Sequence, residues 1–142
     1  VALRERGRPL PRCAVCISPW SDLNCSNASY HYRAAADPMI PPEDVRFMAG
    51  LYLGGADPES PLASPNRADL TGLPPLLIHV GRDEVLLDDA LVLDQAARSA
   101  GVDSTLEIWD DMIHVWHAFH PMLPEGRDAI ARVGEYLRSQ WA

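Results

Sequence analysis

Three histidines stand at intervals of three residues in the stretch DDMIHVWHAFHPM: His114, His117 and His120. A histidine side chain can exchange a proton near neutral pH or bind a metal ion, so this stretch could serve catalysis or hold a metal. An acidic residue, Asp83, lies in a second polar stretch, VGRDEVLLDD. A carboxylate bound to one imidazole nitrogen fixes the tautomer and leaves the other nitrogen free to act as a base. Asp83 and His114 could therefore be two parts of a Ser-His-Asp triad. The alternative is that Asp83 caps a turn and His114 is a surface loop residue.

The elements around these residues predict an α/β fold with a parallel sheet. Apolar runs predict strands, and periodic segments bounded by Pro, acids and Gly predict helices. The expected strands are 12–18, 75–81 and 104–110, the expected helices are 42–55, 88–101 and 124–141, and a long loop covers 19–42. Strands that alternate with helices are typical of βαβ units. Asp83 and His114 each follow a strand, so both are expected at the carboxyl edge of the sheet, where ligands bind.

Two amphipathic patterns make finer predictions. Residues 104–110 alternate between polar and apolar, which predicts a strand with one buried face. In the last helix the apolar residues Ile130, Val133, Leu137 and Trp141 share a face, which predicts an amphipathic helix. The opening residues, VALRERGRPLP, are typical of the end of a helix that lacks a start signal, so we expect a chain cut from a longer protein.

Three phrases together resemble a known family: SPWSDL, SPNRADLTGLPPLLIHVGRDEVLLDDA and IWDDMIHVWHAF. They resemble the C-terminal half of the α/β-hydrolase fold, in the hormone-sensitive-lipase-like branch of bacterial esterases and lipases, from about Arg12 to Tyr136. The resemblance implies that residues 1–142 are the C-terminal part of a single domain and carry the last three strands of its sheet, with the N-terminal half absent. It implies that Asp83, in a G-x-x-D-x-L-like turn, is the triad acid. It also implies that His114, in a G-M-x-H-x-F-like phrase with Asp111 in place of the glycine, is the base.

The remaining parts of the family's catalytic apparatus are absent from this sequence. No G-x-S-x-G pentapeptide, which would carry the nucleophile, and no HGGG-like stretch for the oxyanion hole occurs in the 142 residues. Four serines lie near the end of the first expected strand, but none is on a tight strand-to-helix turn, so we expect none to substitute: Ser18, Ser21, Ser26 and Ser29. The prediction is a carboxylic ester hydrolase acting on a small ester or acylglycerol when complete, and a chain that is inactive alone.

Large apolar side chains in the long loop and the following helix are candidates for a substrate pocket. The resemblance implies that this region helps to line the acyl pocket, and the residues expected there are Trp20, Phe47 and Met48. Val115, directly after His114, is a further pocket candidate. The alternative is that they are ordinary packing residues.

A metal site is the least favoured hypothesis. Cys13 and Cys16 are three positions apart in an expected strand and should therefore face opposite sides of the sheet. His117 and His120 are expected to be bystanders on the helical turn after His114, so no metal or other cofactor is predicted. A small zinc-binding protein remains a weak alternative.

Composition limits the possible partners. A net charge of −8 and a pI near 4.9 argue against nucleic acid, and no run approaches the roughly 20 apolar residues of a membrane span. Three cysteines favour a reducing compartment, so we expect a cytoplasmic protein. The edge of the first strand is expected to pair with the missing N-terminal half or with a second copy. A non-catalytic, hydrolase-like interaction module remains the main alternative function.

Overall fold

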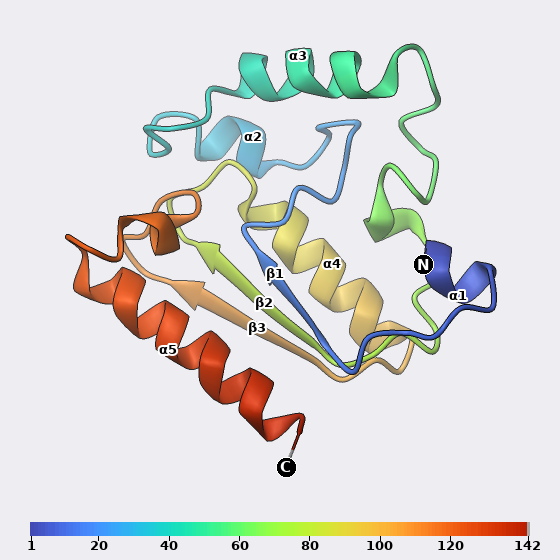
Figure 1. The fold of residues 1–142 in the computed structure, drawn as a ribbon. Helices are drawn as coiled ribbons and strands as arrows, with labels where there is room; N and C mark the ends of the chain where they lie inside the picture. Colours follow the sequence, from blue (N-terminus) through green and yellow to red (C-terminus); the bar gives the residue numbers. More distant parts are fainter. Residues whose placement is uncertain (142) are drawn as a thin grey trace.

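Three parallel strands form the centre of the molecule in this computed structural model, which describes residues 1–141. The strands are β1 (Ala14–Ile17), β2 (Leu76–Gly81) and β3 (Ser104–Trp109), and they lie in the order β1-β2-β3 (Figure 1). The middle strand, β2, is buried along its whole length. A continuous apolar run is typical of a parallel strand covered on both faces. The predicted α/β class with a parallel sheet is confirmed.

The register of the strands brings their carboxyl ends to one edge. Cys16 of β1 lies opposite Ile78 of β2, and Ile78 lies opposite Leu106 of β3. The pairing continues one residue past β1, where the Ser18 N–H donates to the His79 carbonyl over 2.8 Å. The loops that follow all three strands therefore start close together.

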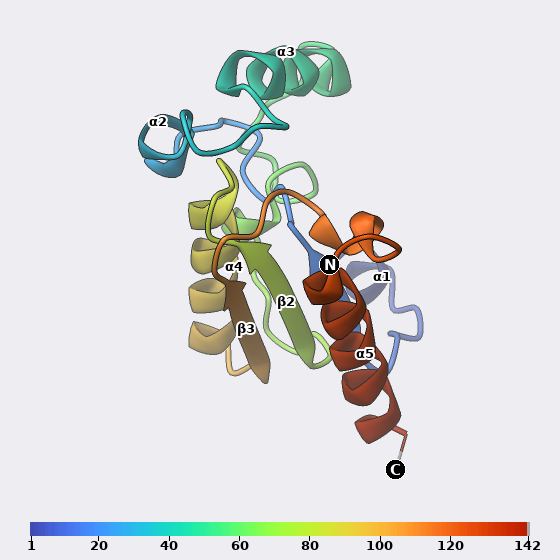
Figure 2. The ribbon, with the colours of Figure 1, turned by 90° about the vertical axis from the view of Figure 1, so that its left-hand side faces the viewer.

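Helices cover both faces of the sheet (Figure 2). Helix α4 (Leu87–Ser99) packs Leu93 and Ala97 against Ile78 and Val80 of β2. On the opposite face, helix α5 (Pro124–Ser139) packs Tyr136 against Leu77. Successive side chains of β2 point to opposite faces of the sheet and therefore pack into two separate cores, one on each face.

A third layer lies over the carboxyl ends of the strands, at the top of Figure 1. It contains α2 (Ser29–Tyr32) and α3 (Pro42–Leu53), and α3 ends at Gly54 with a left-handed φ of 54°, as its sequence pattern predicts. A buried cluster joins this layer to the loop after β2: Leu23, Cys25, Tyr30, Val45, Ala49, Val85 and Leu86. The shorter helical segments are α1 (Ala2–Glu5), η1 (Pro65–Arg67) and η2 (Trp116–Phe119).

The predicted amphipathic helix is present as α5, but most of its apolar stripe is exposed. In α5 the buried residues are Gly126, Ala129 and Tyr136, and Val133 is partly buried, whereas Ile130 and Leu137 are exposed, as is Trp141 beyond the end of the helix. Tyr136 and Val133 pack against Leu77 of the sheet, whereas the small residues Gly126 and Ala129 form the face next to η2. That face lets the helix approach the turn at η2, where a Cβ on Gly126 would meet His120 at 3.0 Å.

Strand β3 also differs from its pattern, since both faces are partly covered. Leu106 and Ile108 pack against the α4 core, while Trp109 packs with Trp116 on the α5 side. No helix within residues 1–141 is long and apolar enough to cross a membrane.

Candidate active site

His114 lies in the loop after β3 and binds a carboxylate. Its Nδ1 is 2.9 Å from Oε2 of Glu84, in the turn after β2. The His114 side chain is 21% exposed, whereas the Glu84 side chain is fully buried. With an ionised carboxylate as acceptor, Nδ1 carries the proton, and Nε2 is left as the basic nitrogen. This arrangement can accept a proton from a hydroxyl and stabilise the resulting imidazolium.

The second oxygen of Glu84 is held by two donors. Oε1 accepts a hydrogen bond from the Ser18 hydroxyl over 2.7 Å and from the Gly81 N–H over 2.6 Å. Three hydrogen-bonding groups therefore surround a carboxylate that has no contact with solvent. A buried charge of this kind persists only when it is paired and hydrogen-bonded in this way.

The predicted pairing of His114 with Asp83 is corrected by these contacts. Asp83 instead lies 3.5 Å from Nη1 of Arg33, and both side chains are partly exposed. Its backbone N–H donates to the Met112 carbonyl over 3.1 Å, which joins the two loops. The turn after β2 thus places residue 83 on its outer side, and residue 84 folds back beneath the strand end.

Glu84 is the carboxylate that contacts His114, and the sequence did not predict this contact. Asp83 and Glu84 are adjacent carboxylates that follow the same strand, and the motif alone does not say which of them turns inward. Gly81 supplies the deciding geometry: a Cβ there would lie 2.2 Å from the Met112 carbonyl oxygen and 3.0 Å from Oε1 of Glu84. The glycine thus allows both the histidine loop and the carboxylate to approach the end of β2.

His117 has a different partner and is more than a bystander on a turn. It is buried in η2, and its Nε2 lies 3.0 Å from Nδ1 of His79, a fully buried residue of β2. Burial, together with a smaller effect of the neighbouring His79, lowers the pKa of His117 to about 4. Burial also lowers the pKa of His79, although Glu107 opposes this shift. His120 is exposed.

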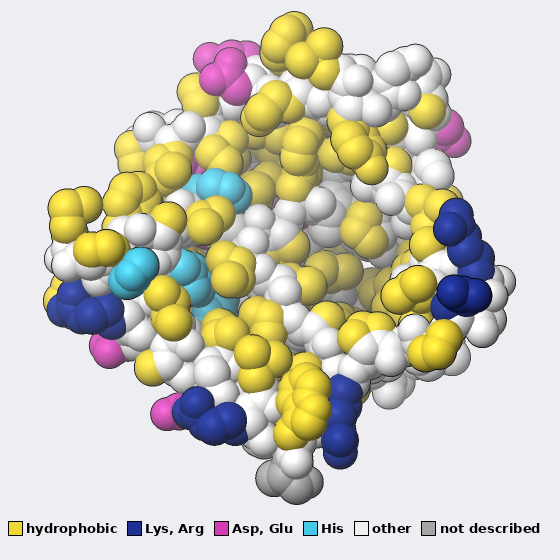
Figure 3. All heavy atoms as spheres, viewed as in Figure 1, with side chains coloured by type: hydrophobic (Ala, Val, Ile, Leu, Met, Phe, Trp, Pro, Cys, Tyr) yellow, Lys and Arg dark blue, Asp and Glu magenta, His cyan; other side chains and the backbone are white. Residues whose placement is uncertain are grey.

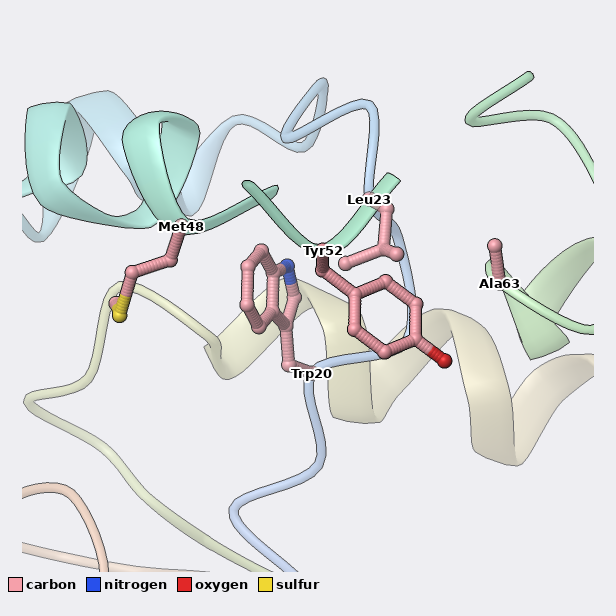
Figure 4. Close-up of a pocket in the computed structure, with 5 residues that line it drawn as sticks. All are labelled: Trp20, Leu23, Met48, Tyr52 and Ala63. Carbon is pink, nitrogen blue, oxygen red and sulfur yellow. The ribbon is translucent and has the colours of Figure 1, made fainter. Parts of the chain in front are cut away.

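An apolar cavity adjoins His114. It has a volume of about 260 Å³ and is lined by Ser18, Trp20, Ile40, Val45, Met48, Leu86 and His114. A neighbouring cavity of about 350 Å³ shares Trp20 and Met48 and is completed by Leu23, Tyr52 and Ala63 (Figure 4). The face shown in Figure 3 is largely hydrophobic and hollowed near its centre.

The four residues expected in a substrate pocket have different positions. Trp20 and Met48 line both cavities, and the Trp20 ring lies between Met48 and Tyr52 (Figure 4). Phe47 is 67% exposed on α3 and is not among the lining residues. Val115 contributes its backbone N–H, which donates to the Ser18 hydroxyl over 3.1 Å.

A buried acid of α4, Asp89, binds the long loop over the site. Oδ1 of Asp89, in the first turn of α4, accepts the Ser21 and Asp22 N–H groups, and its Oδ2 accepts the Tyr30 hydroxyl. Burial raises the pKa of Asp89 to about 6, although its hydrogen bonds with Asn27 and Tyr30 oppose that shift. This desolvated side chain therefore helps to anchor the loop to α4.

The serines and cysteines that sequence analysis considered have structural contacts. The hydroxyls of Ser18, Ser21, Ser26 and Ser29 donate respectively to Glu84, the Asp89 carbonyl, Asp22 and the Val85 carbonyl. Cys13 packs on the α5 face and Cys16 on the α4 face, so the two lie on opposite sides of the sheet, as predicted.

Comparison with known proteins identifies the fold family. Residues 1–118 match the family model described as the alpha/beta hydrolase fold. An acetyl-hydrolase of Streptomyces hygroscopicus is 57% identical over 138 residues, which are 97% of this chain and 46% of that protein. The crystal structure of EstE5 soaked in ethyl alcohol superposes with a TM-score of 0.98 at 64% identity and covers 99% of this chain.

An esterase from the bacterial hormone-sensitive lipase family is 55% identical, with a TM-score of 0.97, and this chain covers 48% of it. The chain thus spans about half the length of the relatives it matches. With the match extending over nearly all of its residues, the chain belongs to the α/β-hydrolase fold family, in its hormone-sensitive-lipase-like branch.

Proposed function

We propose that this chain supplies the base and the acid of a serine-type carboxylic ester hydrolase, with His114 as the base and Glu84 as the acid. The observation that carries the proposal is the 2.9 Å contact between His114 Nδ1 and a fully buried carboxylate, beside an apolar cavity that His114 lines. In the reaction, Nε2 takes the proton of a serine hydroxyl as that oxygen attacks the ester carbonyl, and then gives it to the leaving alcohol. Asp83 is assigned no direct part.

The nucleophile and the oxyanion hole come from outside the 142 residues in this proposal. The sequence contains neither a G-x-S-x-G nor an HGGG-like stretch. Base and acid without a positioned hydroxyl give no acyl transfer, so the isolated chain is inactive. The substrate is a small ester or acylglycerol, whose apolar part occupies the cavities lined by Trp20 and Met48.

The partner that completes the site is the N-terminal half of the hydrolase domain. Within residues 1–141, β1 pairs only with β2, so its other edge is available for a further strand. Apolar side chains are exposed at the end of β1 and on the outer face of α5, including Ile17, Ile130 and Leu137. These surfaces are those that a second half of the domain would cover. Self-association through the same edge is the competing use of this surface.

A cytoplasmic location is part of the proposal. All three cysteines, Cys13, Cys16 and Cys25, are free thiols. Free thiols are typical of a reducing compartment.

The test uses two forms of the protein. The first is the 142-residue chain alone, and the second is a chimera in which residues 1–142 replace the matching segment of the 64%-identical esterase. Hydrolysis of a short-chain p-nitrophenyl ester is expected from the chimera and not from the chain alone. His114→Ala should reduce the activity of the chimera to background, while His120→Ala, at an exposed position, should leave it unchanged.

Two results would contradict the proposal. Activity of the isolated chain that is lost with His114→Ala would show that the chain has its own nucleophile. A folded chimera that retains activity after His114→Ala would show that His114 is not the base, and would favour a non-catalytic interaction module.

A further inference from the structure

Ser18 occupies an unusual position at the end of β1. Its side chain is buried, with the residue only 4% exposed, and its φ is 46°. A left-handed φ is uncommon for a residue other than glycine and persists where the surrounding contacts enforce it. The Ser18 N–H is also the last donor from the β1 side to β2, through the His79 carbonyl. The backbone here is therefore fixed by the sheet, and the hydroxyl is fixed with it.

The Ser18 hydroxyl joins the loops that carry the acid and the base. It donates to Oε1 of Glu84 over 2.7 Å and accepts the N–H of Val115 over 3.1 Å. Val115 directly follows His114 and also has a left-handed φ, 50°. One oxygen atom thus bridges the turn after β2 and the loop after β3.

The bridge decides which oxygen of Glu84 faces His114. The Ser18 hydroxyl and the Gly81 N–H both bind Oε1, and this leaves Oε2 as the acceptor for His114 Nδ1. Without the hydroxyl, one hydrogen bond to the buried carboxylate is lost and the Val115 N–H loses its partner. Both loops would then gain conformational freedom where Glu84 contacts and orients the His114 imidazole.

We propose that Ser18 is a positioning residue, which sets the orientation of Glu84 and His114 through its hydroxyl without touching the reacting atoms. The inference rests on the proposed function, in which those two residues are the acid and the base. It adds the end of β1 as a third element on which the site depends.

The test compares Ser18→Ala and Ser18→Gly in the full-length chimera. Glycine removes the hydroxyl and also tolerates the left-handed φ, so this variant separates loss of the hydroxyl from backbone strain. Both variants are expected to lower kcat by about 10- to 100-fold while KM changes by less than about threefold, because a misplaced base affects the chemical step.

Ser21→Ala is the matched control. Ser21 is a fully buried serine three residues along the same loop, and its hydroxyl donates to the Asp89 carbonyl over 2.9 Å, away from His114. This variant should lower the melting temperature and leave kcat within about threefold of the unmutated chimera. A loss of kcat in Ser21→Ala equal to that in Ser18→Ala would overturn the positioning role. Retention of kcat in Ser18→Gly would overturn it as well.

A second measurement needs no turnover. The Nδ1 proton of His114 should give a downfield NMR resonance in the 142-residue chain, and that resonance should weaken or shift in Ser18→Gly and persist in Ser21→Ala. An unchanged resonance in Ser18→Gly would contradict the inference. Failure of the proposed function has a different result, because the unmutated chimera would then lack activity dependent on His114.

Discussion

Two histidines on the same loop, His114 and His117, are three residues apart and have opposite surroundings. His114 is partly exposed and contacts the buried carboxylate of Glu84 at 2.9 Å. His117 is 6% exposed, and its contact at 3.0 Å is with another imidazole, that of His79. The first pair combines a base with an anion that stabilises its protonated form, whereas the second pair places two bases together away from water.

The difference shows that the partner, and not the residue type, decides what a histidine can do. In the His79–His117 pair one nitrogen must donate and the other accept, so protonation of both rings would set two N–H donors against each other. Glu107 lies 3.1 Å from His79 Nε2, but its other oxygen binds Arg132. Burial thus disfavours protonation of this pair, which lies beneath the loop, and of the three histidines His114 is the one suited to proton transfer.

The largest expected effect comes from Glu84→Gln in the full-length chimera. An amide cannot stabilise the imidazolium and can favour the wrong tautomer of His114, so kcat should fall by about 10³- to 10⁴-fold. The measurement is steady-state hydrolysis of a short-chain p-nitrophenyl ester.

Asp83→Asn is the matched control, since it makes the same chemical change at the adjacent carboxylate. Its kcat should stay within about tenfold of the unmutated chimera, because Asp83 is paired with Arg33 and not with His114. The reverse order of the two effects would restore Asp83 as the acid.

A smaller effect is expected from His117 on stability as a function of pH. The pKa of His117 is about 4 in the folded chain and 6.5 in the unfolded one, so the unfolded state binds more protons between these values. Stability from this group is fully present above pH 6.5 and is lost as pH falls towards 4. This pKa shift corresponds to a change of about 3 kcal/mol in the free energy of unfolding.

His117→Gln isolates this contribution, because its amide can still donate to His79 and does not titrate. The free energy of unfolding is measured with urea at pH 7.5 and at pH 4.5 for both proteins. Its decrease between the two pH values should be about 2 to 3 kcal/mol smaller in the variant than in the unmutated chain. Asp89 acts in the opposite direction, since its raised pKa of about 6 removes stability as pH rises from 3.8 to 6. The contribution of Asp89 is the same in the unmutated chain and in His117→Gln, so it cancels when the two pH dependences are compared. Equal pH dependence would show that His117 is not buried as a neutral base.

The fold was more accessible from sequence than the site. Apolar runs bounded by Pro and Gly predicted the three strands within about two residues, because burial on both faces of a parallel sheet demands such runs. The order of the loops also placed His114 at the carboxyl edge. The choice between Asp83 and Glu84 depends on a turn of a few residues whose direction is set by tertiary contacts with Met112 and Ser18. No local pattern carries that information. The same limit applies to α5, where tertiary packing buries Gly126, Ala129 and Tyr136 and leaves the apolar residues Ile130 and Leu137 exposed.

The smallest expected effect concerns the Arg33–Asp83 pair. Its 3.5 Å contact joins side chains that are 26% and 32% exposed, and an ion pair in partial contact with water contributes little. A double-mutant cycle with Arg33→Gln and Asp83→Asn should therefore give a coupling energy below about 1 kcal/mol in urea unfolding, and salt should reduce it further. A coupling above about 2 kcal/mol would place Asp83 in a desolvated network comparable with that of Glu84. The two adjacent carboxylates would then differ less than their contacts indicate, and the assignment of the acid would rest on the kinetic comparison alone.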